Sequence, residues 1–192
     1  MQMDFQQQKA RQLRRKDRSN EGKWDKAIIS LCNKINKKRE YYTTSSCAGR
    51  ITLVKGLREK ARNVFLFKTH EKIKFIQLKK ELEKIRKKER GLIYFKQEPC
   101  ILHVACQDFE AGLNLLRKAR EAGWKRSGII SQDKKRKRVM LELMSTEKME
   151  LPIINKGEVL VSEEYLKLLV KEANKKLERV RGKIKKFENI FK

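Results

Sequence analysis

Residues 92–106 read LIYFKQEPCILHVAC, and this stretch decides the fold that we expect for the chain. Two runs rich in apolar and β-branched residues, 92–96 and 101–106, flank the polar segment Gln97-Glu98-Pro99. Such runs are typical of short strands, and a proline between them marks an interruption. We therefore expect two strands joined by residues 97–99.

Helices are predicted on both sides of this stretch. Residues 72–90 carry an apolar face at helical spacing, and Gly91 follows where a helix commonly ends. Asp108 is a good N-cap for a second helix, which Gly123 ends. The inward side chains expected for the two helices are Phe75, Ile76, Leu82 and Ile85 in the first, and Phe109, Leu113, Leu116 and Ala119 in the second.

The remaining elements extend the same alternation of helices and strand pairs. We expect a basic N-terminal helix within residues 1–20, a helix over 25–38, and a long C-terminal helix over 162–190. Strands are expected at residues 51–54, 64–67, 124–131 and 139–144, and residues 151–161 are extended but interrupted at Gly157. The order predicts one α+β domain over residues 1–192, with a mixed, largely antiparallel sheet of about six strands. The nine glycines form neither a G-x-G-x-x-G nor a Walker-type loop, so neither a Rossmann cofactor site nor an NTPase site is indicated.

The charge of the chain points to a polyanionic partner. Lys and Arg number 50 against 24 Asp and Glu, which gives a formal net charge of +26. A surface rich in both signs, as in many thermophilic proteins, would be more nearly balanced. Such a charge attracts nucleic acid or an anionic membrane surface, and nucleic acid is the expected partner, because each cation that meets a phosphate releases condensed counterions.

Location and redox state follow from what the chain lacks. No apolar run approaches the roughly 20 residues that a membrane-spanning helix needs, so no membrane association is expected. The four cysteines show neither zinc-site spacing nor the density of a secreted disulfide scaffold. We expect reduced thiols, no metal, and a cytoplasmic protein, while the oligomeric state stays open.

Residues 43–50 read TTSSCAGR, the least ordinary stretch of the chain, and we expect a polar loop there. Backbone N–H groups beside Gly49 could receive an anion, with the hydroxyls and Arg50 adding hydrogen bonds. A polar loop around a buried Cys47 explains the composition equally well. A thiol nucleophile is disfavoured, because the spacing from Cys47 to Arg50 is too short for the phosphatase signature and no base is evident.

The two histidines and one tryptophan leave alternatives open. His70 and His103 are either satisfied structural residues or groups that accept a proton or bind substrate near neutral pH. Trp124 either stacks on an unpaired base, with Lys125 and Arg126 on phosphates, or lies in the core. The basic run 134–138 is either a solvated hairpin tip or a phosphate clamp.

Several of these segments together resemble the tRNA wybutosine-synthesizing protein 3 family, in order and through most of the chain. The longest matching strings are SSCAGRI at residues 45–51 and EPCILHV at residues 98–104. One departure is Ala48, where the family commonly has Ser, so a role for a hydroxyl there is in doubt. The shorter matches are Asp17-Arg18-Ser19, His70-Glu71, Ala122-Gly123, Ser127-Gly128, Leu151-Pro152, Tyr165 and Asn174.

The resemblance implies an S-adenosylmethionine-dependent methyltransferase that modifies N-4 of a demethylwyosine-type tricyclic guanine 3′ of the anticodon in phenylalanine tRNA. A base in the single-stranded anticodon loop can enter a pocket at little unpairing cost. On this interpretation either His103 or Glu98 accepts the proton. Residues assigned to the cofactor are Ser45, Ser46, Cys47, Gly49, Ser127 and Gly128. Residues assigned to the tRNA are Arg18, Arg50, His70, Trp124, Lys125 and Arg126.

Two competing hypotheses keep RNA but change the activity. One is another RNA-directed enzyme, such as a nuclease, which would turn over without S-adenosylmethionine. The other is a non-catalytic basic RNA-binding accessory protein, whose binding would survive loss of Arg50 and Ser46 because its charge lies elsewhere.

Overall fold

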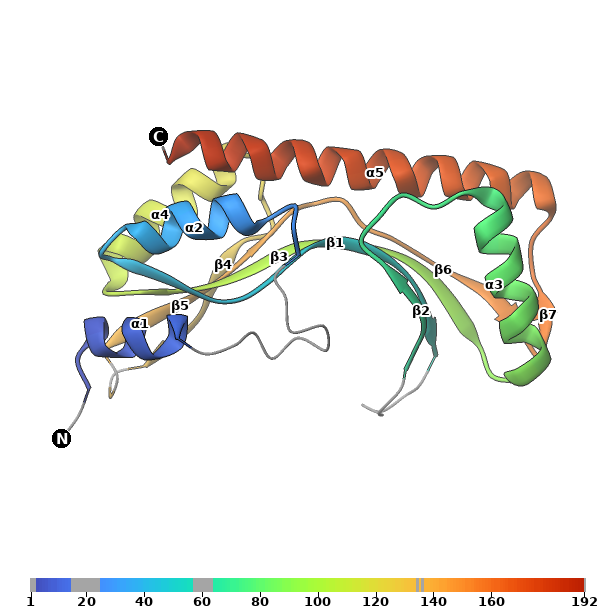
Figure 1. Ribbon diagram of the computed structural model, residues 1–192, viewed down its shortest axis with the longest axis horizontal. Coiled ribbons are helices and arrows are strands. Elements are labelled where there is room, and N and C mark those ends of the chain that lie inside the picture. Colours follow the sequence, from blue (N-terminus) through green and yellow to red (C-terminus); the bar gives the residue numbers. More distant parts are fainter. Residues whose placement is uncertain (1–2, 15–24, 57–63, 134, 136, 192) are drawn as a thin grey trace. The chain divides into compact units, whose positions relative to one another are not determined.

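The structure, a computed structural model, describes residues 3–14, 25–56, 64–133, 135 and 137–191, which form five helices and seven strands (Figure 1). The helices are α1 (Phe5–Leu13), α2 (Ile29–Lys37), α3 (Phe75–Lys88), α4 (Phe109–Glu121) and α5 (Glu163–Ile190). The strands are β1 (Tyr41–Lys55), β2 (Phe65–Thr69), β3 (Ile93–Cys106), β4 (Gly128–Asp133), β5 (Arg138–Met144), β6 (Met149–Asn155) and β7 (Glu158–Val159).

The strands pair in the order β2-β1-β3-β5-β4, with β6 on β3 and β7 on β6, and every pairing whose register is given is antiparallel. The predicted α+β class with a largely antiparallel sheet is therefore confirmed. The chain divides into two compact units, and β1, β3 and α5 contribute residues to both. The first unit comprises Met1–Ala48, Cys100–Thr146 and Val180–Lys192; the second comprises Gly49–Pro99 and Glu147–Arg179.

The first unit covers both faces of its strands. α2, α4 and the last turns of α5 pack on one face, and α1 packs on the other (Figure 1). The larger core includes Trp124, whose ring meets Phe187 edge-on at a centroid distance of 5.2 Å. On the opposite face Phe5 of α1 packs on Tyr42, 5.1 Å between ring centroids, and near Ala105.

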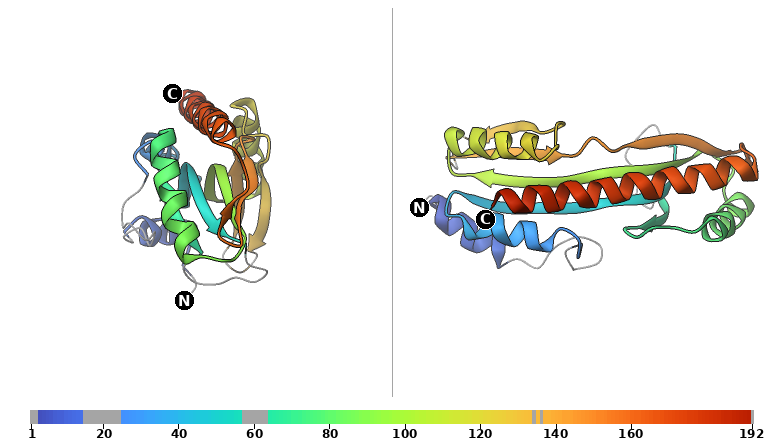
Figure 2. Two further views of the ribbon diagram at one scale, coloured as in Figure 1. Left: turned by 90° about the vertical axis from the view of Figure 1, so that its right-hand side faces the viewer. Right: turned by 90° about the horizontal axis from the view of Figure 1, so that it is seen from above.

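The second unit has a single core between its strands and two helices. α3 and the first half of α5 share this core with β1, β3 and β6 (Figure 2). Asn174 on α5 ties down the segment before α3, because its side chain bonds both the N–H and the carbonyl of Ile73 at 3.0 and 2.8 Å. The turn between β6 and β7 places Lys156 and Gly157 at φ of 50° and 81°, as a tight hairpin requires.

The ends of α4 and the apolar face of α5 confirm the sequence predictions. The Asp108 carboxylate accepts from the Ala111 N–H at 2.8 Å, and Gly123 follows the helix with φ of 90°. The predicted positions of α5 are all buried: Leu166, Leu169, Ala173, Leu177, Val180 and Ile184. Among the described residues no helix is long and apolar enough to cross a bilayer.

The expected break at Gln97-Glu98-Pro99 is wrong, because β3 runs through it as one strand. Residues up to Gln97 pair with β6, and residues from Ile101 onward pair with β5. Pro99 falls in the gap between these two pairings, where the missing N–H costs no ladder hydrogen bond on that side. Pro99 marks the point where β3 changes its pairing partner from β6 to β5, whereas we had expected a loop there.

The expected polar loop at 43–50 is also wrong, because these residues form the first half of β1. Thr and Tyr side chains suit a strand, and the Thr43 N–H donates to Asn36 at 2.8 Å. Gly49 alone departs from strand geometry, with φ of 84°. This left-handed residue lies where the chain passes from the first unit to the second.

The predicted inward faces of α3 and α4 are partly wrong. Ile76 is 76% exposed, and Leu78 is buried in its place. Phe109 and Leu113 are about half exposed at 50% and 47%, whereas Leu115 is fully buried. The described part of the N-terminal helix is shorter than expected, Arg18 lies outside the described residues, and the single-domain assignment stays a prediction.

Candidate active site

A row of three polar side chains crosses neighbouring strands of the first unit. His103 on β3 pairs in register with Glu142 on β5, and its Nε2 lies 3.1 Å from the Glu142 carboxylate. On its other side, Nδ1 of His103 lies 2.7 Å from the hydroxyl of Ser45 on β1. We call Ser45, His103 and Glu142 the polar row.

Strand alternation explains why His103 is available for this role. Its neighbours Leu102 and Val104 are buried in the larger core, so His103 faces the opposite side of the sheet, the side on which α1 packs. The His103 and Glu142 side chains keep 29% and 36% exposure, and Ser45 is exposed. The polar row therefore reaches solvent at its Ser45 end.

The partners of His103 assign its tautomer. An ionised carboxylate accepts hydrogen bonds only, so Nε2 carries the proton and donates to Glu142. Nδ1 is then the acceptor, and the Ser45 hydroxyl donates to it. This order, hydroxyl to imidazole to carboxylate, can draw a proton away from a group bound at Ser45 and hold it beside a negative charge.

The surface next to Glu142 is open. Gly128 on β4 pairs in register with Glu142, and a Cβ built on Gly128 would meet no atom within 4 Å. Ser127 differs from its neighbour, because it is buried and bonds only backbone: its hydroxyl donates to the Trp124 carbonyl at 2.6 Å and accepts from the Met144 N–H at 3.0 Å. Gly128 can therefore lie next to a bound ligand. Ser127 instead fixes the backbone just before β4 through its two hydrogen bonds.

Trp124 has a structural role, which corrects the expected stacking on a base. Its side chain is fully buried, and its indole N–H donates to the Lys183 carbonyl at 3.2 Å. The ring is therefore not presented to a ligand. Lys125 and Arg126, which follow it, are exposed and remain suited to phosphate contacts.

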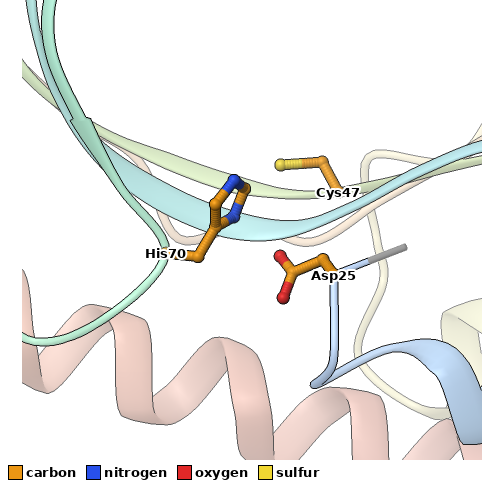
Figure 3. A group of neighbouring side chains, drawn as sticks. All are labelled: Asp25, Cys47 and His70. Atoms are coloured by element: carbon orange, nitrogen blue, oxygen red, sulfur yellow. The ribbon is translucent and has the colours of Figure 1, made fainter. Parts of the chain in front are cut away.

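The polar run of β1 is anchored from both sides. The Thr44 hydroxyl donates to the His103 carbonyl at 3.4 Å, and the Asp25 carboxylate accepts from the Ala48 N–H at 2.9 Å. Asp25 also lies within 4.8 Å of the Cys47 thiol, and Figure 3 draws both side chains beside β1. Ser46 and Cys47 are half-buried. These contacts hold residues 44–48 in place at the edge of the polar row.

The second unit contains its own group of predicted residues. Arg50 on β1 forms an ion pair with Glu98 on β3, and its guanidinium lies 4.7 Å from the centre of the Phe65 ring. His70, drawn in Figure 3 just after β2, has Nδ1 3.1 Å from the Gly49 carbonyl and so donates to it. Glu98 thus already has a permanent cation as partner.

Sequence reasoning missed Glu142 and Asp25. Glu142 lies between the buried Leu141 and Leu143, so its outward position was readable from strand alternation. Its meeting with His103 was not readable, because that depends on the register between β3 and β5. Asp25 was visible only as the expected start of a helix.

Comparison with known proteins identifies relatives over nearly the whole chain. A family model described as Methyltransferase TYW3 matches residues 5–192. A protein of Thermococcus sibiricus named tRNA(Phe) 7-((3-amino-3-carboxypropyl)-4-demethylwyosine(37)-N(4))-methyltransferase is 37% identical over 175 residues, 90% of this chain and 86% of its own. A human tRNA wybutosine-synthesizing protein 3 homolog is 34% identical over 98% of this chain and 72% of its own. The solved structure of the PH1069 protein from Pyrococcus horikoshii is similar with a TM-score of 0.79 and 32% identity, covering 90% of this chain and 87% of its own.

Proposed function

The chain belongs to the Methyltransferase TYW3 family, and from this we propose that it methylates phenylalanine tRNA with S-adenosylmethionine as the donor. The proposed acceptor is the N-4 nitrogen of a demethylwyosine-type tricyclic guanine 3′ of the anticodon, in line with the name of the archaeal relative. The observation that carries the proposal is the polar row, an exposed hydroxyl backed by an imidazole and a carboxylate.

The polar row supplies the proton chemistry that nitrogen methylation requires. A nitrogen that gains a methyl group must lose its proton to leave a neutral product. The proton of the target N–H passes to the Ser45 oxygen while the hydroxyl proton of Ser45 passes to Nδ1 of His103, so the serine ends as a neutral hydroxyl. Glu142 stabilises the imidazolium that results. We therefore choose His103 over Glu98 as the proton acceptor.

The residues around the polar row fit a polar methyl donor. S-adenosylmethionine, when bound, supplies a methyl group on a sulfonium and needs no metal. The hydroxyls of Ser45 and Ser46 and the thiol of Cys47 offer hydrogen bonds at the β1 end of the polar row, and Gly128 leaves open space beside Glu142 at its other end. Ser127 is not included, because its hydroxyl is buried against backbone. The role of these residues is to hold and align the reactants, which is the main demand of methyl transfer.

Positive charge provides affinity for the tRNA. The net charge of +26 favours binding of any RNA, and the exposed Lys125 and Arg126 flank the strand that carries Gly128. Arg50 and His70 of the second unit are further proposed tRNA contacts, as is Arg18. The four cysteines are free thiols, in keeping with a cytoplasmic location.

The decisive experiment incubates the protein with labelled S-adenosylmethionine and phenylalanine tRNA carrying the unmethylated tricyclic base. Nucleoside mass spectrometry should find one added methyl group on that base. A tRNA that already carries the methyl group is the matched control and should gain none. Binding of the tRNA without any methyl gain would contradict the proposal and favour the accessory-protein hypothesis, and turnover without the donor would favour another RNA-directed enzyme.

A further inference from the structure

A basic cavity lies at the tip of the β4–β5 hairpin in the first unit. It has a volume of about 690 Å³, and its walls include Arg39, Lys135 and Lys137 together with Asp4, Gln107 and Asp108. A smaller cavity of about 290 Å³ shares Gln107, Asp108 and Lys137 with it. We call the two together the hairpin cavity, and none of its residues belongs to the polar row.

Three cations of the larger part of the hairpin cavity are uncommitted, whereas Arg138 of the smaller part pairs with Asp133 at 3.9 Å. Arg39, Lys135 and Lys137 are exposed, and none of them forms an ion pair within the part of the chain that the structure describes. Asp4 and Asp108 instead cap α1 and α4, accepting from backbone N–H groups at 2.8 Å in both cases. Helix N-termini offset the charge of such carboxylates. The cavity therefore presents a positive field to solvent.

Lys137 occupies a backbone position that disfavours lysine. Its φ is 47°, in the left-handed region, where a residue with a Cβ costs about 1 kcal/mol and glycine or asparagine is preferred. Its side chain lines both parts of the hairpin cavity. Lys137 therefore brings an exposed ammonium group to both parts of the hairpin cavity, beside Arg39 and Lys135 of the larger part.

The geometry points to RNA: we propose that the hairpin cavity binds the sugar-phosphate backbone of the RNA substrate. α1 packs on the sheet face to which His103 points, and the first residues of α1 line the cavity. The cavity begins at Gln107, directly after the end of β3 and four residues beyond His103, or roughly 13 Å at strand spacing. α1 covers Ala105 between them, so we expect an RNA strand that crosses α1 on this face to reach both the polar row and the cavity. Phe5, the aromatic residue of the larger part, is buried, so contacts in that part go to phosphate rather than to bases, whereas the half-exposed Phe109 lines only the smaller part.

This inference rests on the proposed function for the identity of the RNA, and its test is separate. Lys135→Gln with Lys137→Gln removes two charges from the cavity; Lys171→Gln with Lys175→Gln removes two exposed charges from α5 of the second unit and is the matched control. Binding of phenylalanine tRNA is measured against salt concentration for each variant and for wild type. The cavity variant should bind roughly tenfold more weakly at low salt, with a salt slope smaller by about 1.5 to 2. Its binding of S-adenosylmethionine, measured by calorimetry, should stay at the wild-type value.

Three outcomes would overturn the inference. In the first, the cavity variant and the control variant show the same salt slope. In the second, the cavity variant also loses binding of S-adenosylmethionine. In the third, inorganic phosphate shifts the hairpin signals of wild type in NMR while tRNA binding is unaffected by the substitutions, which assigns the cavity to a small free anion. If wild type binds tRNA but transfers no methyl group, the proposed function fails, and the salt slopes still decide whether the cavity binds RNA.

Discussion

In the first unit Glu142 contacts a histidine on the neighbouring strand, whereas in the second unit Glu98 contacts an arginine on the neighbouring strand. The two pairs are similar in exposure, with side chains 25% to 36% accessible. Their chemistry differs, because a guanidinium never releases its proton and an imidazole exchanges one near neutral pH. The His103–Glu142 pair also has a third member, the exposed Ser45 hydroxyl. The Arg50–Glu98 pair instead has the aromatic ring of Phe65 beside the guanidinium. We propose that the same strand geometry gives a proton path in the first unit, whereas in the second it gives an ion pair that cannot relay a proton.

Substitution of His103 is expected to have the largest effect. His103→Ala removes the acceptor for the Ser45 proton, and kcat should fall roughly a hundredfold to ten-thousandfold, the range for loss of a general base. Single-turnover methyl transfer to the unmethylated tRNA measures it. Retention of the wild-type rate by His103→Ala, alone or combined with Glu98→Gln, would remove the polar row from the mechanism.

Glu142→Gln is expected to have an intermediate effect. The amide keeps the shape of the side chain but cannot stabilise an imidazolium, so kcat should fall by about tenfold to a hundredfold. The loss is smaller than for a buried carboxylate because Glu142 is 36% exposed. KM for tRNA should change by less than about twofold, since a partner of the base contributes to the transition state only. A rise in KM at constant kcat would assign Glu142 to tRNA binding instead.

Glu98→Gln should separate the two regions most clearly. Loss of the Arg50 ion pair should lower the free energy of unfolding by about 1 kcal/mol, the upper range for partly exposed pairs. The rate of methyl transfer should stay within about threefold of wild type. Glu89→Gln breaks a pair of similar exposure with Lys55 in the same unit and is the control. A rate loss as large as that of His103→Ala, seen for Glu98→Gln and not for Glu89→Gln, would make Glu98 the proton acceptor.

The sequence predicted the helices and strands better than it predicted which of them pack or pair with one another. The face of α5 was readable because its apolar residues recur at three- and four-residue steps over the whole helix. The face of α4 was misjudged because Gly112, a residue without a side chain, is the one directed at β5; a Cβ there would lie 3.5 Å from Val139. Close approach of a helix to a sheet at glycine leaves no apolar signal in the sequence.

The candidate site also shows that the sequence predicts single residues better than it predicts which residues meet. Ser45 and His103 were selected on matching strings, and the structure brings them together. Trp124 was misassigned because an aromatic beside two cations has the same composition in a core turn as in an RNA-binding loop. Glu142 was missed because its role depends on which strand pairs with β3. Local pattern and resemblance select candidate residues, but only the register between strands decides which of them meet.

The smallest predicted effect compares the two units through their acid sensitivity. The pKa of Glu150 in the second unit is lowered by its hydrogen bonds to Lys96 and Lys148, at 2.6 and 2.9 Å. The pKa of Glu188 in the first unit is lowered by the Ser30 hydroxyl, which donates at 2.7 Å, and by Lys34. A carboxyl group with a folded-state pKa below its unfolded value stabilises the fold above the unfolded pKa, and this is lost as the pH falls through the folded pKa.

Glu150→Gln and Glu188→Gln should therefore each lower the free energy of unfolding by roughly 0.5 kcal/mol at neutral pH, the size expected for exposed pairs. The difference from wild type should shrink as the pH falls below the ordinary range of glutamate and vanish once the pH lies below the lowered folded-state pKa of each group. Urea unfolding at a series of pH values measures this, and methyl transfer at neutral pH should be unchanged in both variants. A cost that persists in acid would mean that the two side chains act by packing rather than by charge. If the two variants lose the same stability with the same pH dependence, ion pairing of this kind does not distinguish the two units. The polar row is then the feature that distinguishes the first unit from the second.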